Sequence, residues 1–168
     1  MLKKILIGIS ICLVLLIVFT YIFTEQTLKY NQNDYETEIA LVKKRLSIES
    51  ELNTVYTYDL TNKDRVRLYT MDDKLIFALA VRDNEDFILY DVKEYSLKED
   101  NILEYQYEKN DNLVNICFGF NKTHNYIIFK QKDTVEGLET KKLLAKDTYI
   151  VIPFYSKEEG IITIEWLL

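Results

Sequence analysis

The side chains that most enzymes use for nucleophilic or metal chemistry are scarce in this sequence. There is one histidine, His124, in the turn-like segment Asn121-Lys122-Thr123-His124-Asn125. Catalytic triads and zinc sites nearly all need histidine, and a single histidine in a turn is most often solvated. Cys117 lies near the same strand end, with no third group to orient the pair. The sequence therefore predicts no catalytic residue, and we do not expect an enzyme.

Acidic and asparagine-rich turns are the second group of candidate ligands. Residues 83–86, 99–101 and 111–112 carry the oxygen atoms that calcium prefers. No segment has the glycine-punctuated loop that makes a calcium site specific, and hairpin turns use these residue types in any case. With only four glycines in the chain, we do not expect a phosphate-binding loop either. The sequence predicts neither a metal site nor a cofactor.

Tyrosine is the abundant residue type that points to binding. The chain has 13 tyrosines, and side chains with an aromatic body and a polar tip are common in interfaces. Most of them alternate with polar residues, which also fits half-buried positions in a sheet. The tyrosines that could line an exposed aromatic surface are Tyr56, Tyr58, Tyr69, Tyr90, Tyr95, Tyr105, Tyr107 and Tyr126. Our candidate partner-binding residues are Tyr56, Tyr58, Tyr69, Tyr105 and Tyr107.

All of these candidate residues follow an apolar segment, Ile5 to Phe23, which contains no charged side chain. At roughly 1.5 Å of rise per residue, a helix of this length matches the roughly 30 Å of hydrocarbon in a bilayer. The segment is longer than the core of a signal peptide and lacks a small-residue cleavage site, so we expect a retained transmembrane anchor. Lys3 and Lys4 precede it and Glu25 follows it. The positive-inside rule then places residues 1–4 in the cytoplasm and the rest of the chain outside it.

Charge and cysteine content narrow the partners further. All 27 acidic residues follow the anchor, whereas two of the 21 basic residues precede it. The remaining chain is acidic and repels phosphate backbones, so nucleic acid is not an expected partner. Cys12 lies inside the anchor and Cys117 far beyond it, which excludes a disulfide between them. Because Ile11 is not the small residue that a lipobox needs, we interpret Cys12 as an apolar filler of the helix.

Residues 24–52 are predicted to form a stalk with a short helix. A capping pattern begins at Asn33, and an apolar stripe follows on one helical face. The helix is expected to end near Leu52. The stripe consists of Tyr35, Ile39, Val42 and Leu46. It either packs on the following domain, which we favour, or forms a short coiled-coil seam that makes a homo-oligomer through the stalk.

From residue 53 to residue 168 the pattern changes to alternation, which predicts an antiparallel β domain. Short polar turns separate nine candidate strands, and no helix long enough for a parallel crossover intervenes. The predicted strands are 55–60, 65–70, 74–82, 87–95, 102–107, 113–120, 126–131, 148–155 and 161–167. So many strands need two packed sheets, as a β-sandwich, or a partly closed barrel.

Two details of the pattern concern the faces of this domain. In 113–120 the apolar residues alternate with Asn115, Cys117 and Gly119, which must share the opposite face of the strand. Residues 133–146 could form a short helix or another strand, and we expect an irregular segment there. The mainly β fold is thus predicted to follow a transmembrane helix and a helical stalk.

The order of these elements resembles a group of small membrane-anchored proteins of low-GC Gram-positive bacteria. The resemblance includes the lysine-flanked anchor and the final Gly160-Ile161-Ile162-Thr163-Ile164-Glu165-Trp166, and it implies an extracytoplasmic β domain without catalytic residues. The chain is also similar to minor pseudopilins, which run a membrane helix into a stalk and a sheet. It lacks their glycine-then-phenylalanine processing site and the early glutamate of their helix.

These observations together favour a membrane-tethered interaction or sensing module. Its expected partner is another envelope protein or an exported peptide, and a toxin-neutralising immunity protein would be one specific form. The first alternative is a structural, pseudopilin-like subunit of a secretion or competence assembly. The second is an envelope hydrolase, which would need convergent acidic groups that sequence alone cannot identify.

Overall fold

The described part of the chain folds into antiparallel β-sheets and one packed helix. The computed structural model describes residues 12–16, 28–97, 102–109, 112–131, 139–156 and 162–167, of which 12–16 are helical. The other elements are β1 (Lys29–Asn31), α2 (Tyr35–Leu46), β2 (Asn53–Asp59), β3 (Arg65–Met71), β4 (Lys74–Asp83), β5 (Asp86–Ser96), β6 (Ile102–Lys109), β7 (Asn112–Asn121), β8 (Tyr126–Gln131), β9 (Glu139–Leu143), β10 (Thr148–Ser156) and β11 (Ile162–Leu167). The mainly β, antiparallel, sandwich-like fold agrees with the prediction.

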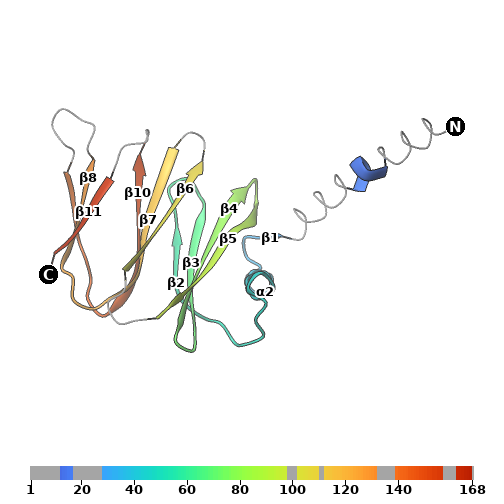
Figure 1. Cartoon of the computed structure of the whole chain (residues 1–168), viewed down its shortest axis with the longest axis horizontal. Coiled ribbons are helices and arrows are strands. Elements are labelled where there is room, and N and C mark those ends of the chain that lie inside the picture. Colours follow the sequence, from blue (N-terminus) through green and yellow to red (C-terminus); the bar gives the residue numbers. More distant parts are fainter. Residues whose placement is uncertain are drawn as a thin grey trace.

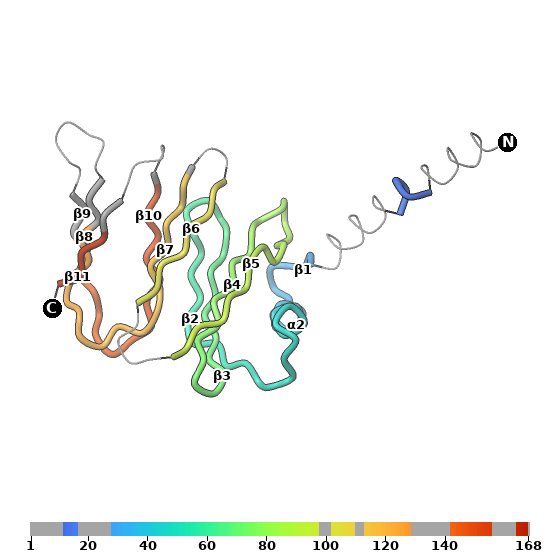
Figure 2. Tube along the Cα trace, viewed as in Figure 1, coloured from blue at the N-terminus to red at the C-terminus, as the bar shows by residue number. Residues whose placement is uncertain are grey.

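Three sheets are stacked on one another. The five-stranded sheet has the order β1-β5-β4-β3-β2, the middle sheet β10-β7-β6 and the outer sheet β11-β8-β9. Helix α2 covers the free face of the five-stranded sheet, and the outer sheet lies at the opposite end of the stack (Figure 1). The chain completes the five-stranded sheet by Ser96, and the residues from Ile102 onwards build the other two sheets (Figure 2).

The largest core lies between the five-stranded sheet and the middle sheet. Its fully buried side chains include Leu75, Phe77, Leu79, Val114, Ile116 and Phe118. The ring of Phe77 lies 4.4 Å from that of Phe118 and 4.7 Å from that of Tyr105, between centroids. Aromatic pairs at this separation stabilise a core beyond the area that they bury. These are the positions that alternation in 74–82 and 113–120 predicts to face inward.

Helix α2 is shorter than the sequence predicts. It begins after Asp34, whose carboxylate accepts a hydrogen bond from the Thr37 amide at 3.0 Å and caps the first turn. It ends at Leu46, because Ser47 adopts a left-handed conformation with φ of 55°. The predicted end near Leu52 is therefore wrong.

The helix and β1 share a second core with the five-stranded sheet. Val42 is fully buried, and Ile39 and Leu46 pack beside it against the outer face of that sheet. Tyr30 of β1 joins the same cluster, and β1 pairs with the start of β5. The apolar stripe thus packs on the domain. Residues 29–52, which the sequence places in a stalk, share this core with the strands that follow.

The outer sheet packs on the other face of the middle sheet, which is therefore covered on both sides. Cys117 and Ile152 from the middle sheet meet Ile127 and Ile164 from the outer sheet in this third cluster. One strand of the outer sheet, β9, pairs with β8 and lies within 133–146. The expectation of an irregular segment is wrong for residues 139–143.

All nine predicted strands are present, and their predicted ends either coincide with the observed ends or differ by at most two residues. The anchor predicted at Ile5 to Phe23 lies outside the described residues except for 12–16. Among the residues that the structure describes, no helix is both long enough and apolar enough to cross a bilayer.

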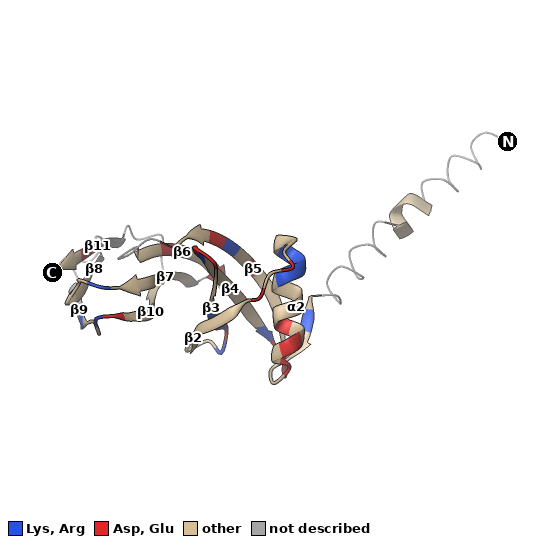
Figure 3. Ribbon diagram, turned by 90° about the horizontal axis from the view of Figure 1, so that it is seen from below, with Lys and Arg blue, Asp and Glu red and all other residues tan. Residues whose placement is uncertain are grey.

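The strands β5, β6 and β11 lie along one flank of the stack (Figure 3). We call this the β6 flank. Contacts confirm the arrangement, because the rings of Tyr90 in β5 and Tyr107 in β6 are 6.2 Å apart. On the other side of β6, Glu104 and Ile164 of β11 line one cavity.

Candidate functional site

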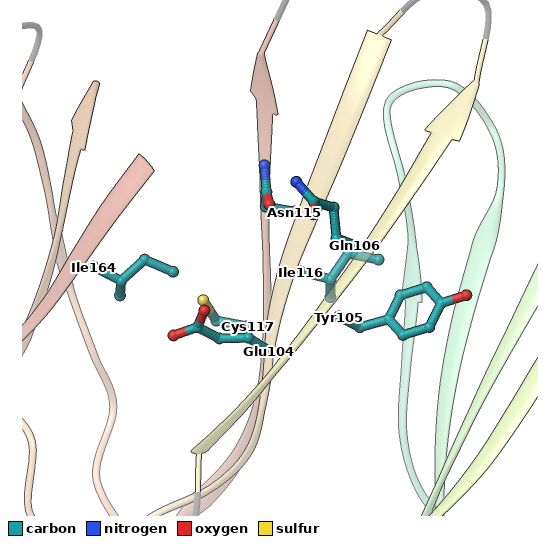
Figure 4. Close-up of a pocket in the computed structure, with 7 residues that line it drawn as sticks. All are labelled: Glu104, Tyr105, Gln106, Asn115, Ile116, Cys117 and Ile164. Carbon is teal, nitrogen blue, oxygen red and sulfur yellow. The ribbon is translucent and has the colours of Figure 1, made fainter. Parts of the chain in front are cut away.

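A cavity of about 240 Å³ lies between the middle sheet and the outer sheet, on the β6 flank. It is lined by Glu104, Tyr105, Gln106, Asn115, Ile116, Cys117 and Ile164 (Figure 4). Six of these residues belong to the β6–β7 hairpin, and Ile164 belongs to β11. Pockets for drug-sized ligands hold roughly 300–1,000 Å³, so this cavity suits a single side chain or a similarly small group.

The pairing of β6 with β7 brings four polar or sulfur-bearing side chains onto one face. Glu104 lies directly opposite Cys117, and Gln106 lies opposite Asn115. Successive side chains of a strand point to opposite faces, so these four face the outer sheet. The ring of Tyr105 points the other way, towards the five-stranded sheet (Figure 4).

Glu104 and Cys117 lie next to each other at one end of the cavity (Figure 4). Burial, and then the charge of the Glu104 carboxylate, raises the pKa of the Cys117 thiol to about 12. Since the thiolate is the nucleophilic form, Cys117 is held as an inert thiol at neutral pH. The Glu104 side chain is exposed, and no Lys, Arg or His among the described residues forms an ion pair with it.

The amides of Asn115 and Gln106 lie together at the other end (Figure 4). The Asn115 Nδ2 atom is buried, and within the described part of the chain it has no hydrogen-bond acceptor. A buried donor without an acceptor costs about 1–3 kcal/mol. A ligand oxygen at this position would remove that cost. The cavity therefore combines a carboxylate at one end with an unused donor at the other.

The five candidate tyrosines are not brought together on an exposed surface. Tyr69, Tyr105 and Tyr107 are buried, and Tyr56 and Tyr58 are half-buried against the main core. The three buried hydroxyls donate to the carboxylates of Glu38, Asp91 and Asp64, respectively, at 2.8, 2.8 and 2.9 Å. Burial is the main cause that raises the pKa of each of the three phenols. These tyrosines contribute to the core and to its polar contacts.

His124 and the acidic turns do not form a site in the described residues. The His124 ring packs edge-on against Trp166 at 5.6 Å between centroids, and it does not line the cavity with Cys117. In the turn 83–86, Asp83 forms an ion pair with Lys29 at 2.7 Å. Residues 99–101 and 111 lie outside the described residues. Across the ranges that are described, no three His, Cys, Asp or Glu side chains converge as metal ligands would.

The sequence did not single out Glu104, Gln106 or Asn115 as candidates. One signal was present, because alternation in 113–120 places Asn115 and Cys117 on the face opposite the main core. Polar side chains on the covered face of a central strand indicate that the contact between the two sheets is not purely apolar at that position. Alternation within a strand does not show which strand of another sheet packs against it. The sequence pattern therefore could not predict the cavity.

Comparison of the chain with protein-family models, curated proteins and solved structures finds no match.

Proposed function

We propose that this protein is a non-enzymatic binding module, held at a membrane by residues 5–23, that binds an exported peptide or another envelope protein at the cavity on the β6 flank. The observation that carries the proposal is the cavity itself. It places within one small space the Glu104 carboxylate and the buried Asn115 Nδ2 donor, neither of which has a partner among the described residues. Both groups can be satisfied by a ligand that brings a cation and an oxygen atom.

The same geometry supports binding rather than catalysis. The raised pKa of Cys117 removes its nucleophile at neutral pH. Glycoside hydrolysis needs two carboxyl groups across a scissile bond, and among the described lining residues Glu104 is the single carboxylate. These features weigh against the hydrolase alternative.

The location is supported by the sequence and by the layer order. In the described helical segment 12–16, Leu13 to Leu16 expose 57–67% of their surface, which suits a helix surrounded by lipid. β1 follows the proposed anchor and lies at the α2 end of the stack (Figure 1). The cavity lies between the two layers that are farthest from β1, where a partner outside the membrane could reach it.

Site-specific photo-cross-linking in native cells tests this function. A photoreactive phenylalanine analogue replaces Gln106, an exposed residue at the cavity, in the full chain. The matched control carries the analogue at Glu85, an exposed residue of the β4–β5 turn. We expect one defined adduct from position 106, identified by mass spectrometry as an envelope protein or exported peptide, and none of it from position 85. The same adducts from both positions, or none from position 106, would refute the proposal.

A further inference from the structure

Strand β6 is the edge of the middle sheet next to the cavity. The sheet order is β10-β7-β6, and in the described part of the chain no strand pairs with the far edge of β6. β6 contains no proline, and its eight pairs with β7 run from Ile102 to Lys109 without a register shift. A regular edge presents unpaired N–H and C=O groups that another strand can pair with.

The two faces of this edge differ in chemistry. Glu104, Gln106 and Glu108 are exposed on the face towards the outer sheet. Tyr105 and Tyr107 are buried on the face towards the five-stranded sheet, and Tyr90 packs beside Tyr107 while exposing 52% of its own surface. A strand added to β6 would place alternate side chains on these two faces.

The position of Tyr90 follows from an irregularity in β5. The β4–β5 register shifts between Leu79 and Ala80, so Tyr90 has no direct partner in β4. A bulge of this kind re-aims a side chain and often lies at a functional edge. Here it leaves an aromatic ring exposed beside β6, on the side opposite the cavity.

The charge beside the edge selects the kind of side chain that fits. Glu104 has no ion-pair partner among the described residues, and the nearest cation along β6, Lys109, is bound to the buried carboxylate of Asp64. Within the described part of the chain, the cavity end with Glu104 therefore carries a negative charge that no cation pairs with. It complements a lysine or arginine side chain, for which an acidic, partly enclosed site gives specificity.

We propose that an extended peptide segment adds to β6 as a fourth strand of the middle sheet. Its lysine or arginine side chain enters the cavity against Glu104, and the adjacent residue packs an apolar side chain on Tyr90. Main-chain hydrogen bonds provide affinity and the alternate side chains provide specificity, which is the usual division in strand addition. This inference rests on the proposed binding function and names the ligand class and the binding mode.

A peptide library with the full chain in detergent micelles tests the side-chain class. We expect selection of short extended peptides with Lys or Arg at one position and an apolar residue next to it. Replacing that basic residue by Gln should weaken binding by up to about fivefold, the effect of losing one ion pair to an exposed carboxylate. Glu104→Lys should reverse the selection to Asp or Glu at the same position, whereas the matched charge reversal Glu85→Lys in the β4–β5 turn should leave it unchanged.

N-methylation of the selected peptide tests the binding mode. In an added strand, the N–H groups of every second residue face β6. A peptide N-methylated at the residues whose N–H groups face β6 should not bind, whereas a peptide N-methylated at the intervening residues should still bind. Peptides that bind without a preference for Lys or Arg, or that bind equally well whichever set of alternate residues is methylated, would overturn the inference while leaving a peptide-binding function in place. If no peptide binds and the adduct at position 106 is also missing, both proposals fail.

Discussion

At the scale of single residues, the buried charges of the described part of the chain, Glu38, Asp64 and Arg67, are all paired within the domain. Glu38 is 1% exposed and accepts hydrogen bonds from Arg67 Nη1 and, at 2.8 Å, from the Tyr69 hydroxyl. Arg67 also donates to Thr57 at 3.2 Å, and its guanidinium lies over the ring of Tyr35. This network joins α2 to β2 and β3 beneath the helix.

Glu38→Ala should strongly destabilise the domain, because it leaves Arg67 buried without its counter-charge. Removing one partner of a buried pair costs about 3–5 kcal/mol. Urea titration of the full chain in micelles, followed by fluorescence, measures the free energy of unfolding. Glu36→Ala, an exposed change in the same helical turn, should stay within about 0.5 kcal/mol. Equal effects of the two substitutions would contradict this account.

Cys117 should be unreactive in the folded state. In a Cys12→Ser background, alkylation by iodoacetamide at pH 8 should be about a thousandfold slower than in urea, because a thiol with a pKa of about 12 forms little thiolate. Mass spectrometry measures the rate. Fast alkylation under native conditions would show that the thiol is neither buried nor shifted.

The same shift gives stability a pH dependence. Above its ordinary pKa near 8.5 the thiol ionises in the unfolded chain, whereas the folded chain keeps the proton until about pH 12. The thiol's contribution is therefore complete below about pH 8.5 and is lost as the pH rises towards 12. The unfolding free energy of the wild type minus that of Cys117→Ala should therefore decrease over this window. The buried tyrosines also titrate at high pH, but they are present in both proteins and their effect cancels in this difference.

Glu38 shows why residue-scale features were not predictable. In the sequence it precedes Ile39 of the apolar stripe and reads as an ordinary helical glutamate. Its burial depends on Arg67, 29 residues away, and no local pattern reports such a partner. The same is true of Asp64, which is fully buried and bonded to Tyr107 and Lys109 of another sheet.

At the scale of elements, alternation was sufficient where strands are long. β7 shows period two over ten residues, and its inward face was predicted. β4 is apolar from Leu75 to Val81, and its prediction was incomplete because both of its faces are buried, one against the middle sheet and one beneath α2. β1 has three residues, Lys-Tyr-Asn, which is too short to show a period. β9 reads Glu-Thr-Lys-Lys-Leu and does not alternate. Both are held by pairing with a neighbour, which propensity does not reveal.

The left-handed residue that ends α2 offers a test at this scale. Ser47→Gly should stabilise the domain by up to about 1 kcal/mol, because the left-handed conformation costs an L-residue roughly 1–2 kcal/mol. The larger backbone entropy that glycine loses on folding offsets about 0.5–1 kcal/mol of this gain. Ser50→Gly, at an exposed position without positive φ, should be neutral or slightly destabilising. Chemical denaturation of both variants measures the difference, and stabilisation by Ser50→Gly alone would show that the conformation of Ser47 does not matter.

At the scale of the whole molecule, the sequence predicted two packed sheets or a closed one, and the structure has three. The middle sheet is apolar on one face and mixed on the other, with Asn115 and Cys117 on the mixed face. A face that mixes polar and apolar residues is usually exposed to solvent. That a third sheet covers it here is determined by tertiary packing and not by the residue pattern of the strands. The candidate site exists because this cover is incomplete on the β6 flank.

The anchor is the other prediction at this scale. We expect the full chain to stay with membranes after an alkaline carbonate wash and its β domain to be digested by protease added outside intact spheroplasts. Val14→Lys with Leu15→Lys should release the protein, because each charge costs about 2.5–3.5 kcal/mol at the centre of a membrane helix. Leu143→Lys, an equivalent change on exposed β9, should not. Retention of the double variant in the pellet would refute the anchor.

The sequential filling of the layers also has a consequence for synthesis. In the five-stranded sheet, β2 to β5 are consecutive in the chain and each pairs with the next, so its contact order is low and it can form early. A chain emerges N-terminal end first, and this sheet is complete before β6 exists. Until the β6–β7 hairpin has been synthesised and packs on this sheet, the side chains of Leu75, Phe77 and Leu79 are exposed to solvent. The nascent first half of the domain is therefore the stage at which the protein is most open to aggregation and to chaperones.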